Sequence, residues 1–314
     1  MIVYFADEVH PRLAALLNAA GYSCVDAFEK PPEELALLMR SSACGMIIRS
    51  RFPVNELFLR SAGALAFVAR FGSGMENIDG RVAHELGIRL FSCPEGNSDA
   101  VADHTIGLML GVMKKITLSN RGVVDARWER EPNRGDELYR KTVAIFGYGN
   151  AGRAVVKRLA GFDCEVLVSD PYVNLNGLPS HARPAAIEEI YEQAEVVSMH
   201  VSLSAETRAM ASASFFNAFR NPLVFINTSR GPVTDSAALL QALHHGRVCY
   251  AGLDVLDVED SSFEDLKDGL RLPHIEALRK HPHCLITPHI AGWSHQSNER
   301  MCELLSGKIT AAFG

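Results

Sequence analysis

A short glycine-rich stretch between an apolar segment and a helical one constrains this chain more than any other sequence feature. The apolar segment Thr142–Phe146 runs directly into Gly147, Gly149 and Gly152, and residues 153–161 follow with a helical pattern. Glycines at this spacing, at a strand-to-helix junction, are typical of a parallel α/β sheet that binds a dinucleotide. The first glycine permits a tight turn, the second the close approach of pyrophosphate, and the third the packing of the helix on the strand.

The residues around these glycines indicate which dinucleotide binds. Asn150 and Ala151 complete the motif at the start of the helix, where N–H groups and the positive dipole end favour phosphate. Asp170 follows the next apolar segment, 23 positions after Gly147, where a ribose-binding acid is expected. A carboxylate there accepts hydrogen bonds from the ribose hydroxyls and repels a 2′-phosphate. The sequence therefore predicts NAD, rather than NADP, as the cofactor.

Short β-branched or aromatic runs alternate with helical patterns along the chain, which predicts parallel α/β layering. The strands expected in the first region are residues 2–5, 23–27, 45–48, 66–69 and 88–91. The six expected in the second, which suit a doubly wound sheet, are residues 142–146, 165–169, 196–199, 223–227, 248–253 and 284–287. One long helix, from residue 97 to about residue 127, is expected to connect the two regions. Residues 260–283, charged and containing two prolines, are expected to form a surface excursion.

Composition and cysteine use exclude several classes of protein. The 314 residues carry a formal net charge of −6, which gives no reason to expect a nucleic-acid partner. Seven widely spaced cysteines without a Cys-x-x-Cys pair indicate reduced thiols, and no cluster of ligand residues completes a metal site. The chain opens on an apolar strand rather than a basic leader, and no apolar run approaches the ~20 residues of a membrane span. We therefore expect a cytoplasmic protein that binds neither metal nor membrane.

Three polar segments each follow a predicted strand of the second region, at the edge where parallel sheets bind ligands. Arg230 lies in the first segment, Glu259 ends the second and His289 lies in the third. Hydride transfer from an alcohol needs a base for the hydroxyl proton, a cation for the substrate carboxylate and a partner that orients the base. Histidine as a residue type changes charge near neutral pH, so His289 suits the base. Arg230 can grip a carboxylate with two hydrogen bonds, and Glu259 can fix the tautomer of His289.

Two loops of the first region carry arginines close to predicted strand ends. Arg49 and Arg51 follow the strand at residues 45–48, and Arg70 follows the strand at residues 66–69. Three cations exceed what a bare hydroxy acid needs, and a phosphate is the obvious additional anion for guanidinium groups. Arginines at strand ends are also common as solvated residues. We expect these three side chains to contact a phosphate of the substrate.

Together these segments resemble the D-isomer-specific 2-hydroxyacid dehydrogenase family over nearly the whole length of the chain. The glycine motif with Asp170 resembles the family's cofactor signature, and the segments around Arg230, Glu259 and His289 resemble its three other signatures. The resemblance implies that these last three residues form the catalytic triad. It also implies two Rossmann-like, doubly wound parallel-sheet domains with the active site in the cleft between them, and a homodimer built around the long connecting helix.

The same resemblance implies domain bounds and further site residues. Residues 1–96 and 290–314 would form the substrate domain, and residues 97–289 the NAD-binding domain. The backbone N–H groups of Ser73 and Gly74 would bind the substrate carboxylate, as an anion-binding nest does. The other residues expected to contact the cofactor are Thr228, Ser229, Asp254 and Gly292.

The arginine-rich loops resemble the phosphate-contacting positions of 3-phosphoglycerate dehydrogenases, which implies a short form of that enzyme, without its regulatory domain, in serine biosynthesis. Two alternatives stay open. A glyoxylate or hydroxypyruvate reductase would use the same triad with a different pocket, and a NAD-sensing corepressor would share the fold as a binding protein. The chain departs from the usual family pattern at Asp103, where Glu is common, at Asp260, where Pro is usual, and in the longer residues 261–283.

Overall fold

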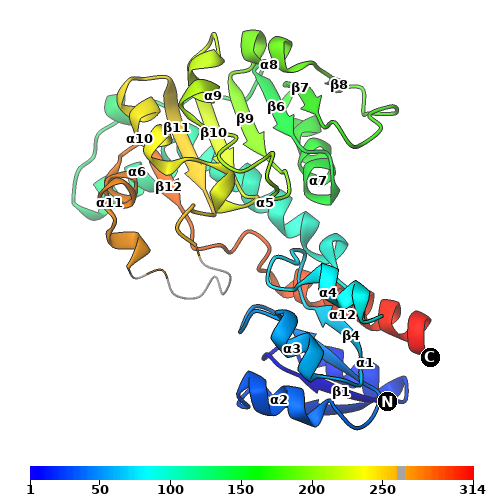
Figure 1. Cartoon of the computed structure of the whole chain (residues 1–314). Helices are drawn as coiled ribbons and strands as arrows, with labels where there is room; N and C mark the ends of the chain where they lie inside the picture. The colour runs from blue at the N-terminus through cyan, green and yellow to red at the C-terminus, as the bar shows by residue number, and fades with distance from the viewer. Residues whose placement is uncertain (260–265, 267) are drawn as a thin grey trace. The chain divides into compact units, whose positions relative to one another are not determined.

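The computed structural model describes residues 1–259, 266 and 268–314, and it contains two compact units, each built on a parallel sheet (Figure 1). The first unit comprises Met1–Ser98 and Trp293–Gly314, and the second comprises Asp99–Glu259 and Leu266–Gly292. The predicted α/β class with two parallel-sheet domains is therefore confirmed. Among the described residues, no helix has the length and apolar character needed to cross a bilayer.

The first unit has a five-stranded sheet in the order β2-β1-β3-β4-β5. Its strands are β1 (Ile2–Phe5), β2 (Ser23–Asp26), β3 (Cys44–Ile48), β4 (Leu65–Arg70) and β5 (Arg89–Phe91). Its helices include α1 (Arg12–Ala19), α2 (Pro32–Leu38), α3 (Glu56–Ser61), α4 (Gly80–Glu85) and α12 (His295–Phe313). The central strand β3 is apolar throughout because it is buried on both faces: Met46 and Ile48 enter one apolar cluster and Ile47 enters the other.

The C-terminal helix α12 completes the core of the first unit. Ser294 and Ser297 form a capping box that satisfies the first N–H groups of the helix. Met301, Leu305 and Ile309 then recur at the spacing of one helical face and enter the apolar cluster that also holds α1. The last residues of the chain therefore belong to the same unit as the first.

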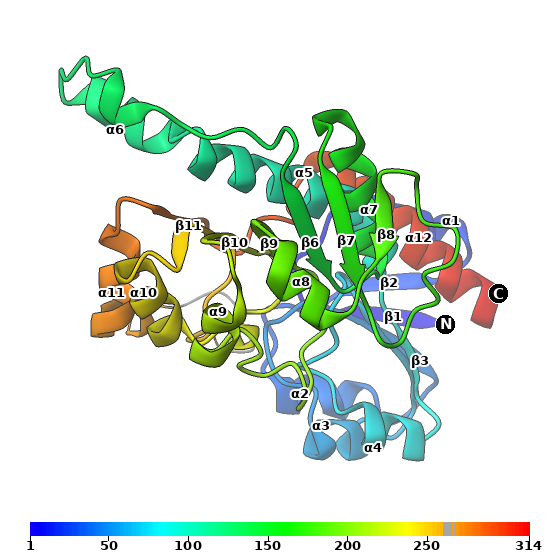
Figure 2. The ribbon, with the colours of Figure 1, turned by 90° about the horizontal axis from the view of Figure 1, so that it is seen from above.

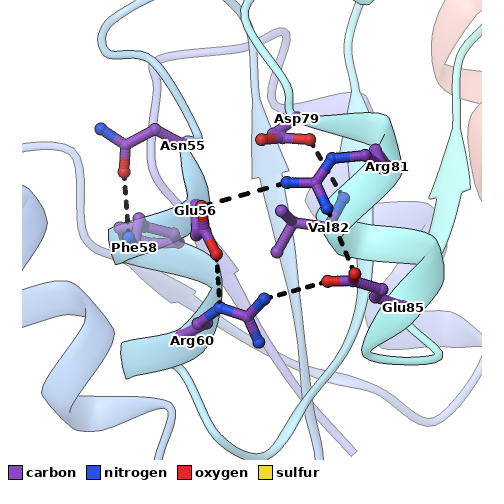
Figure 3. A network of polar contacts seen from close by, with 8 residues as sticks. All are labelled: Asn55, Glu56, Phe58, Arg60, Asp79, Arg81, Val82 and Glu85. Carbon is purple, nitrogen blue, oxygen red and sulfur yellow. Dashed lines mark hydrogen bonds and ion pairs between the residues drawn. The ribbon is translucent and has the colours of Figure 1, made fainter.

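A network of polar contacts joins α3 to α4 in this unit (Figure 3). The side chain of Asp79 caps α4 by accepting a hydrogen bond from the Val82 N–H group. Arg60 on α3 bonds both Glu56 and Glu85, so it bridges the two helices. All these ion pairs are solvent-exposed, so each contributes little by itself. These contacts hold α4 against α3, and α4 directly follows the loop at residues 71–79, which contains Ser73 and Gly74.

The second unit has a seven-stranded sheet in the order β12-β11-β10-β9-β6-β7-β8. Its strands are β6 (Thr142–Phe146), β7 (Glu165–Ser169), β8 (Ala182–Pro184), β9 (Val196–Met199), β10 (Leu223–Asn227), β11 (Val248–Leu253) and β12 (Cys284–Ile286). Its helices include α7 (Asn150–Leu159), α8 (Ile187–Gln193), α9 (Ala213–Ala218) and α10 (Ser236–His244). The six predicted strands are confirmed, and the short edge strand β8 is additional. The strand order reverses between β6 and β9, and such a switch point is where doubly wound sheets bind ligands.

The predicted long connecting helix is two helices, α5 (Pro94–Met113) and α6 (Ile116–Val124). The helix breaks at Lys115, whose φ of 54° is left-handed, and α6 continues beyond the far end of α5, away from the strands of its sheet (Figure 2). The prediction of one helix was wrong because the residue in the left-handed conformation is a lysine, and lysine gives no sequence signal for that conformation.

The predicted excursion at residues 260–283 is only partly described. Asp260 and most of residues 261–267 lie outside the described residues. Residues 268–283 contain α11 (Pro273–Lys280), in which Ile275 and Leu278 are fully buried in the main core of the second unit. Pro273 occupies the first turn, where a missing N–H costs nothing. Most of these residues do lie at the surface, but the prediction missed that the proline starts a helix that packs on the second unit through Ile275 and Leu278.

Candidate active site

The glycine motif follows β6 and fits a dinucleotide for three different structural reasons. Gly147 has a φ of 93°, and a Cβ there would lie 2.6 Å from the carbonyl oxygen of His200. A Cβ on Gly152 would lie 2.0 Å from the carbonyl oxygen of Gly147, so the helix approaches the strand only because this residue is glycine. A Cβ on Gly149 would meet no described atom within 4 Å. The open position is the one at which pyrophosphate is expected to approach.

The start of α7 is free to receive an anion. Gly149 is the N-cap residue and offers no side-chain cap to the first N–H groups, which belong to the turn that Asn150 and Ala151 open. The carboxylate of Asp170 accepts hydrogen bonds from the N–H groups of Tyr148 at 2.7 Å and Tyr172 at 2.9 Å. Asp170 is therefore fixed beside the glycine motif. These features fit the pyrophosphate and ribose of a dinucleotide.

The three predicted catalytic residues follow β10, β11 and β12, which are neighbours in the sheet. Because these strands are parallel, their carboxyl ends lie at one edge, so Arg230, Glu259 and His289 all follow strands that end there. Gly231 keeps the first two loops in contact, since a Cβ there would lie 1.8 Å from the carbonyl oxygen of Leu256. A larger residue at position 231 would separate the arginine loop from the acid loop.

Glu259 and His289 form the central contact of the site. Glu259 Oε2 lies 2.6 Å from His289 Nδ1, and the other oxygen, Oε1, accepts the Leu256 N–H group at 2.6 Å. The Glu259 side chain is 5% exposed and that of His289 is 28% exposed. A buried carboxylate on Nδ1 fixes the ring orientation and assigns the proton of the neutral ring to that nitrogen. Acid–base chemistry then belongs to Nε2.

The loop that carries His289 is fixed by Asp254, whose side chain is 1% exposed. Its carboxylate accepts hydrogen bonds from Thr287 Oγ1 at 2.6 Å and from the N–H groups of Ile290 and Ala291 at 2.9 and 2.7 Å. His289 itself has a φ of 52°, a conformation that a non-glycine residue adopts only where the surroundings impose it. The predicted contact of Asp254 with the cofactor stays a prediction, as does that of Gly292, which ends the unit.

The loop that carries Arg230 is organised by Asn227 at the end of β10. Asn227 Nδ2 donates to the Arg230 carbonyl at 3.0 Å, and its Oδ1 accepts both the N–H and the hydroxyl of Ser229, at 2.9 and 2.8 Å. Thr228 Oγ1 lies 2.8 Å from Thr105 Oγ1 on α5. One Arg230 N–H group donates to the Ser229 carbonyl at 2.8 Å. The predicted contacts of Thr228 and Ser229 with the cofactor stay predictions.

In the first unit, Asp7 organises the loop that carries two of the predicted substrate arginines. One oxygen of its carboxylate accepts the N–H groups of Arg49, Ser50 and Arg51 at 2.6, 3.0 and 3.2 Å. The loop backbone after β3 is thereby fixed by an internal anion. Asp7 was not predicted from sequence, although it lies just beyond β1, the strand next to β3.

The three arginines of the first unit differ in their contacts. Arg51 donates to the carbonyl oxygens of Phe28 and Lys30, so part of its guanidinium serves the fold. Arg70 Nε donates to the Arg49 carbonyl at 3.3 Å. No described residue accepts a hydrogen bond from the Arg49 guanidinium, and none accepts one from the backbone N–H groups of Ser73 and Gly74. The Arg49 guanidinium and the N–H groups of Ser73 and Gly74 are among the donors expected to contact the substrate.

Two further histidines near the expected ligands were missed in the sequence. His200 follows β9 directly, beside the glycine motif, and burial lowers its pKa to about 4. Its Nδ1 is buried without a partner among the described residues, while Nε2 bonds Ser198 Oγ at 2.9 Å. His104 Nε2 lies 2.9 Å from Thr287 Oγ1 and acts as the donor, because the Thr287 proton goes to Asp254. Only their positions in the chain could have indicated them: His200 directly follows the strand β9, and His104 lies on the helix α5.

Comparison with known proteins places this geometry in a family context. The model of the NAD-binding domain of D-isomer specific 2-hydroxyacid dehydrogenases matches residues 106–291. The chain is 29% identical over 269 residues to hydroxypyruvate reductase of Thermotoga maritima, covering 86% of this chain and 84% of that protein. It is 30% identical over 285 residues to D-3-phosphoglycerate dehydrogenase of Mycobacterium tuberculosis, covering 88% of this chain and 53% of that protein. The chain thus spans about half the length of that dehydrogenase.

Solved structures share the fold over almost the entire chain. The TT0316 protein from Thermus thermophilus has a TM-score of 0.82 at 27% identity, covering 98% of this chain and 94% of that one. A glyoxylate reductase from Paecilomyes thermophila has a TM-score of 0.86 at 22% identity, covering 99% of this chain and 95% of that one. A D-lactate dehydrogenase from Aquifex aeolicus, complexed with NAD and lactic acid, has a TM-score of 0.83 at 23% identity, covering 99% and 95%.

Proposed function

The chain belongs to the D-isomer specific 2-hydroxyacid dehydrogenase family of NAD-dependent oxidoreductases, and we propose that it acts on a D-2-hydroxy acid that carries a phosphate on C3, such as D-3-phosphoglycerate. NAD is the cofactor of the family, as the sequence predicts. The observation that carries the proposed reaction is the contact of 2.6 Å between buried Glu259 and His289, in loops that follow neighbouring strands.

The proposed chemistry assigns one task to each residue of the triad. His289 takes the proton of the C2 hydroxyl at Nε2 during oxidation and returns it during reduction. Glu259, held on Nδ1, keeps the ring in the useful tautomer and stabilises the imidazolium that forms. Arg230 binds the substrate carboxylate and polarises the oxygen on C2. NAD, when bound, accepts or supplies the hydride at C2.

The residues proposed to hold NAD belong to the second unit. Gly149 leaves room for the pyrophosphate, and the uncapped N–H groups of α7 bind it. Asp170, already fixed by the N–H groups of Tyr148, Tyr172 and Val173, keeps a lone pair on Oδ2 with which to accept a ribose hydroxyl. The buried position of Asp254 suits a residue that orients the loop around the nicotinamide end.

We propose that the phosphate of the substrate binds to Arg49, Arg51 and Arg70 of the first unit. Arg49 supports it most directly, since none of the described residues uses its guanidinium in a hydrogen bond or ion pair. The N–H groups of Ser73 and Gly74 would bind the carboxylate end of the same substrate. Oxidation would then yield 3-phosphohydroxypyruvate, and we propose serine biosynthesis as the setting.

A hydroxypyruvate or glyoxylate reductase is the second candidate. The Thermotoga maritima hydroxypyruvate reductase favours it, since the chain covers 84% of that relative's length. Initial rates with NAD and D-3-phosphoglycerate, D-glycerate, D-lactate and glycolate, and with NADH and the matching 2-oxo acids, separate the two. We expect the highest kcat/KM for the phosphorylated pair, and a preference for hydroxypyruvate or glyoxylate would favour the alternative.

We further propose a homodimer that forms through α6. Ile116, Val123 and Val124 on this helix are apolar and exposed, Val124 to 76%. A second copy of the chain would cover them, since an exposed apolar patch marks an association surface. Sedimentation equilibrium should show a dimer that Val124→Glu weakens, and a monomer at all concentrations would contradict the proposal. The seven cysteines are free, which suits the reducing cytoplasm proposed as its location.

A further inference from the structure

Arg49 and Trp293 form a cation–π pair in the first unit. The guanidinium carbon of Arg49 lies over the Trp293 ring, 4.6 Å from its centroid. Trp293 is 62% exposed, so the ring covers one side of the guanidinium at the protein surface rather than burying it. Trp293 also lies only four positions after His289 in the chain.

The backbone of Arg49 is fixed on both sides of its α-carbon. Its N–H group donates to the Asp7 carboxylate at 2.6 Å. Its carbonyl oxygen accepts from Arg70 Nε at 3.3 Å and from Asn77 Nδ2 at 3.1 Å. With the backbone held, the direction of the guanidinium depends on the rotatable bonds of the side chain, and the contact with the Trp293 ring restricts them.

Two other arginines of the first unit also lie over aromatic rings but use their N–H groups within the fold. Arg51 lies over Phe52 and donates to two backbone carbonyl oxygens. Arg89 lies over Phe313 and donates to the Ala312 carbonyl at 3.1 Å. Arg49 differs, because its side chain makes no hydrogen bond or ion pair with any residue the structure describes.

A cation–π contact holds a guanidinium by its charge and consumes none of its five N–H donors. A guanidinium is also less strongly hydrated than an ammonium, which favours both the ring contact and the exchange of water for an anion. A planar fork that is held in place and still has its donors is suited to a phosphate or a second carboxylate.

We propose that Trp293 is a positioning residue that orients Arg49 toward the second anionic group of the substrate. The pair would thereby set the preference for a substrate that carries two anionic groups. The proposal rests on the proposed function, in which Arg49 faces the phosphate on C3. Trp293 contributes by restricting the side chain before the substrate arrives, so that less conformational entropy is lost on binding.

Fluorescence tests anion binding by the pair without any turnover. The chain has two tryptophans, so Trp128→Phe leaves Trp293 as the single reporter. Titration of this variant with D-3-phosphoglycerate should change the Trp293 emission in a saturable manner, and D-glycerate should give a smaller change. Adding Arg49→Ala should abolish the response, whereas Arg89→Gln, which breaks the cation–π pair of Arg89 with Phe313, should preserve it. An unchanged emission, or a response that survives Arg49→Ala, would overturn the proposal.

Kinetics test the positioning role against a merely structural one. Trp293→Leu should raise KM for D-3-phosphoglycerate about two- to fivefold, the range of an exposed cation–π contact, and leave kcat nearly unchanged. Trp293→Phe, which keeps a ring, should restore most of the affinity. In the Arg49→Ala background, Trp293→Leu should have no further effect.

The substrate comparison keeps the two proposals separate. Trp293→Leu should leave KM for D-glycerate unchanged, and an equal rise for both substrates would show that Trp293 only supports the fold. The KM for D-malate, a dicarboxylate, shows whether the pair recognises phosphate alone or any second anionic group. Absence of turnover with every D-2-hydroxy acid would refute the proposed function, while the fluorescence titration would still decide whether the pair binds an anion.

Discussion

The two units differ in how they hold the side chains expected to meet the substrate. In the second unit, the catalytic side chains are held by contacts between their own functional groups, such as the contact of the Glu259 carboxylate with Nδ1 of His289. In the first unit, Asp7 fixes the backbone of the arginine loop, and the guanidinium of Arg49 keeps its donors. Acid–base chemistry needs a ring in one orientation, whereas recognition of an anion needs donors that the protein has not used.

The largest effect on the reaction rate is expected for the catalytic residues of the second unit. His289→Ala should lower the rate of hydride transfer by at least about a hundredfold, since acid–base catalysis is worth about 10²–10⁴. Arg230→Ala should also lose at least about a hundredfold, because the carboxylate loses its charge-assisted bonds. Single-turnover rates measure the loss, and calorimetric titration should show NAD binding unchanged. Near-normal turnover by His289→Ala would remove the proposed mechanism.

The first unit allows a sharper comparison between two arginines two positions apart. Arg49→Ala should lower kcat/KM for D-3-phosphoglycerate about tenfold to a hundredfold, with a much smaller loss for D-glycerate. Arg51→Ala should lose less in kcat/KM, because part of its guanidinium serves the fold, and should also lower the free energy of unfolding by ~1–3 kcal/mol, because the carbonyl oxygens of Phe28 and Lys30 lose their donor. Denaturant unfolding and kinetics on both substrates separate the effects. Equal losses on both substrates for Arg49→Ala would contradict the phosphate assignment.

Asp170 tests whether a carboxylate fixed by backbone N–H groups also selects the cofactor. Asp170→Ser should reduce the preference for NAD over NADP by about tenfold, since a hydrogen bond to the ribose is lost and the repulsion of a 2′-phosphate disappears. The ratio of kcat/KM values for the two cofactors measures the change. Thermal unfolding is the control, because Asp170 also accepts the Tyr148 and Tyr172 N–H groups. An unaltered protein that used both cofactors equally well would contradict the assignment.

The smallest predicted effect concerns His200, whose pKa is lowered from 6.5 to about 4 by burial. The unfolded chain takes up a proton below about pH 6.5 that the folded chain accepts only near pH 4, so acid favours unfolding. Between pH 7 and pH 5.5 this should lower the free energy of unfolding by ~1 kcal/mol. His200→Gln should flatten the pH dependence in that window, and the exposed control His245→Gln should leave it unchanged. Identical slopes for both variants would contradict the burial argument.

What the sequence predicted followed from local patterns. Short apolar runs identify six strands of the second unit. The glycine motif follows one of these strands, and the segments of Arg230, Glu259 and His289 follow three others. The edge strand β8 was missed because Ala182–Pro184 contains no β-branched or aromatic residue and ends in a proline. The break at Lys115 was missed because the left-handed residue is not a glycine. The helix α11 was missed because Pro273, one of the two prolines from which a surface excursion was predicted, begins it.

The residues that support the site were harder to predict, because their roles depend on which strands are neighbours. Asp7 reaches the arginine loop since β1 pairs with β3, which the chain order does not state. His104 meets the loop of His289 from a helix 183 positions away from its partner Thr287. Trp293 was not predicted to belong to the site, because its contact with Arg49 joins residues that are distant in sequence. Such contacts require the three-dimensional fold.

Transfer of deuterium from C2 tests the central claim most directly. The unaltered protein would be incubated with NAD and D-3-phosphoglycerate or D-glycerate deuterated at C2, and the reduced cofactor analysed by mass spectrometry. The account predicts one deuterium in each reduced cofactor, faster formation from the phosphorylated acid, and formation at least about a hundredfold slower in His289→Ala. Reduced cofactor without deuterium, or no reduced cofactor from either acid, would contradict it.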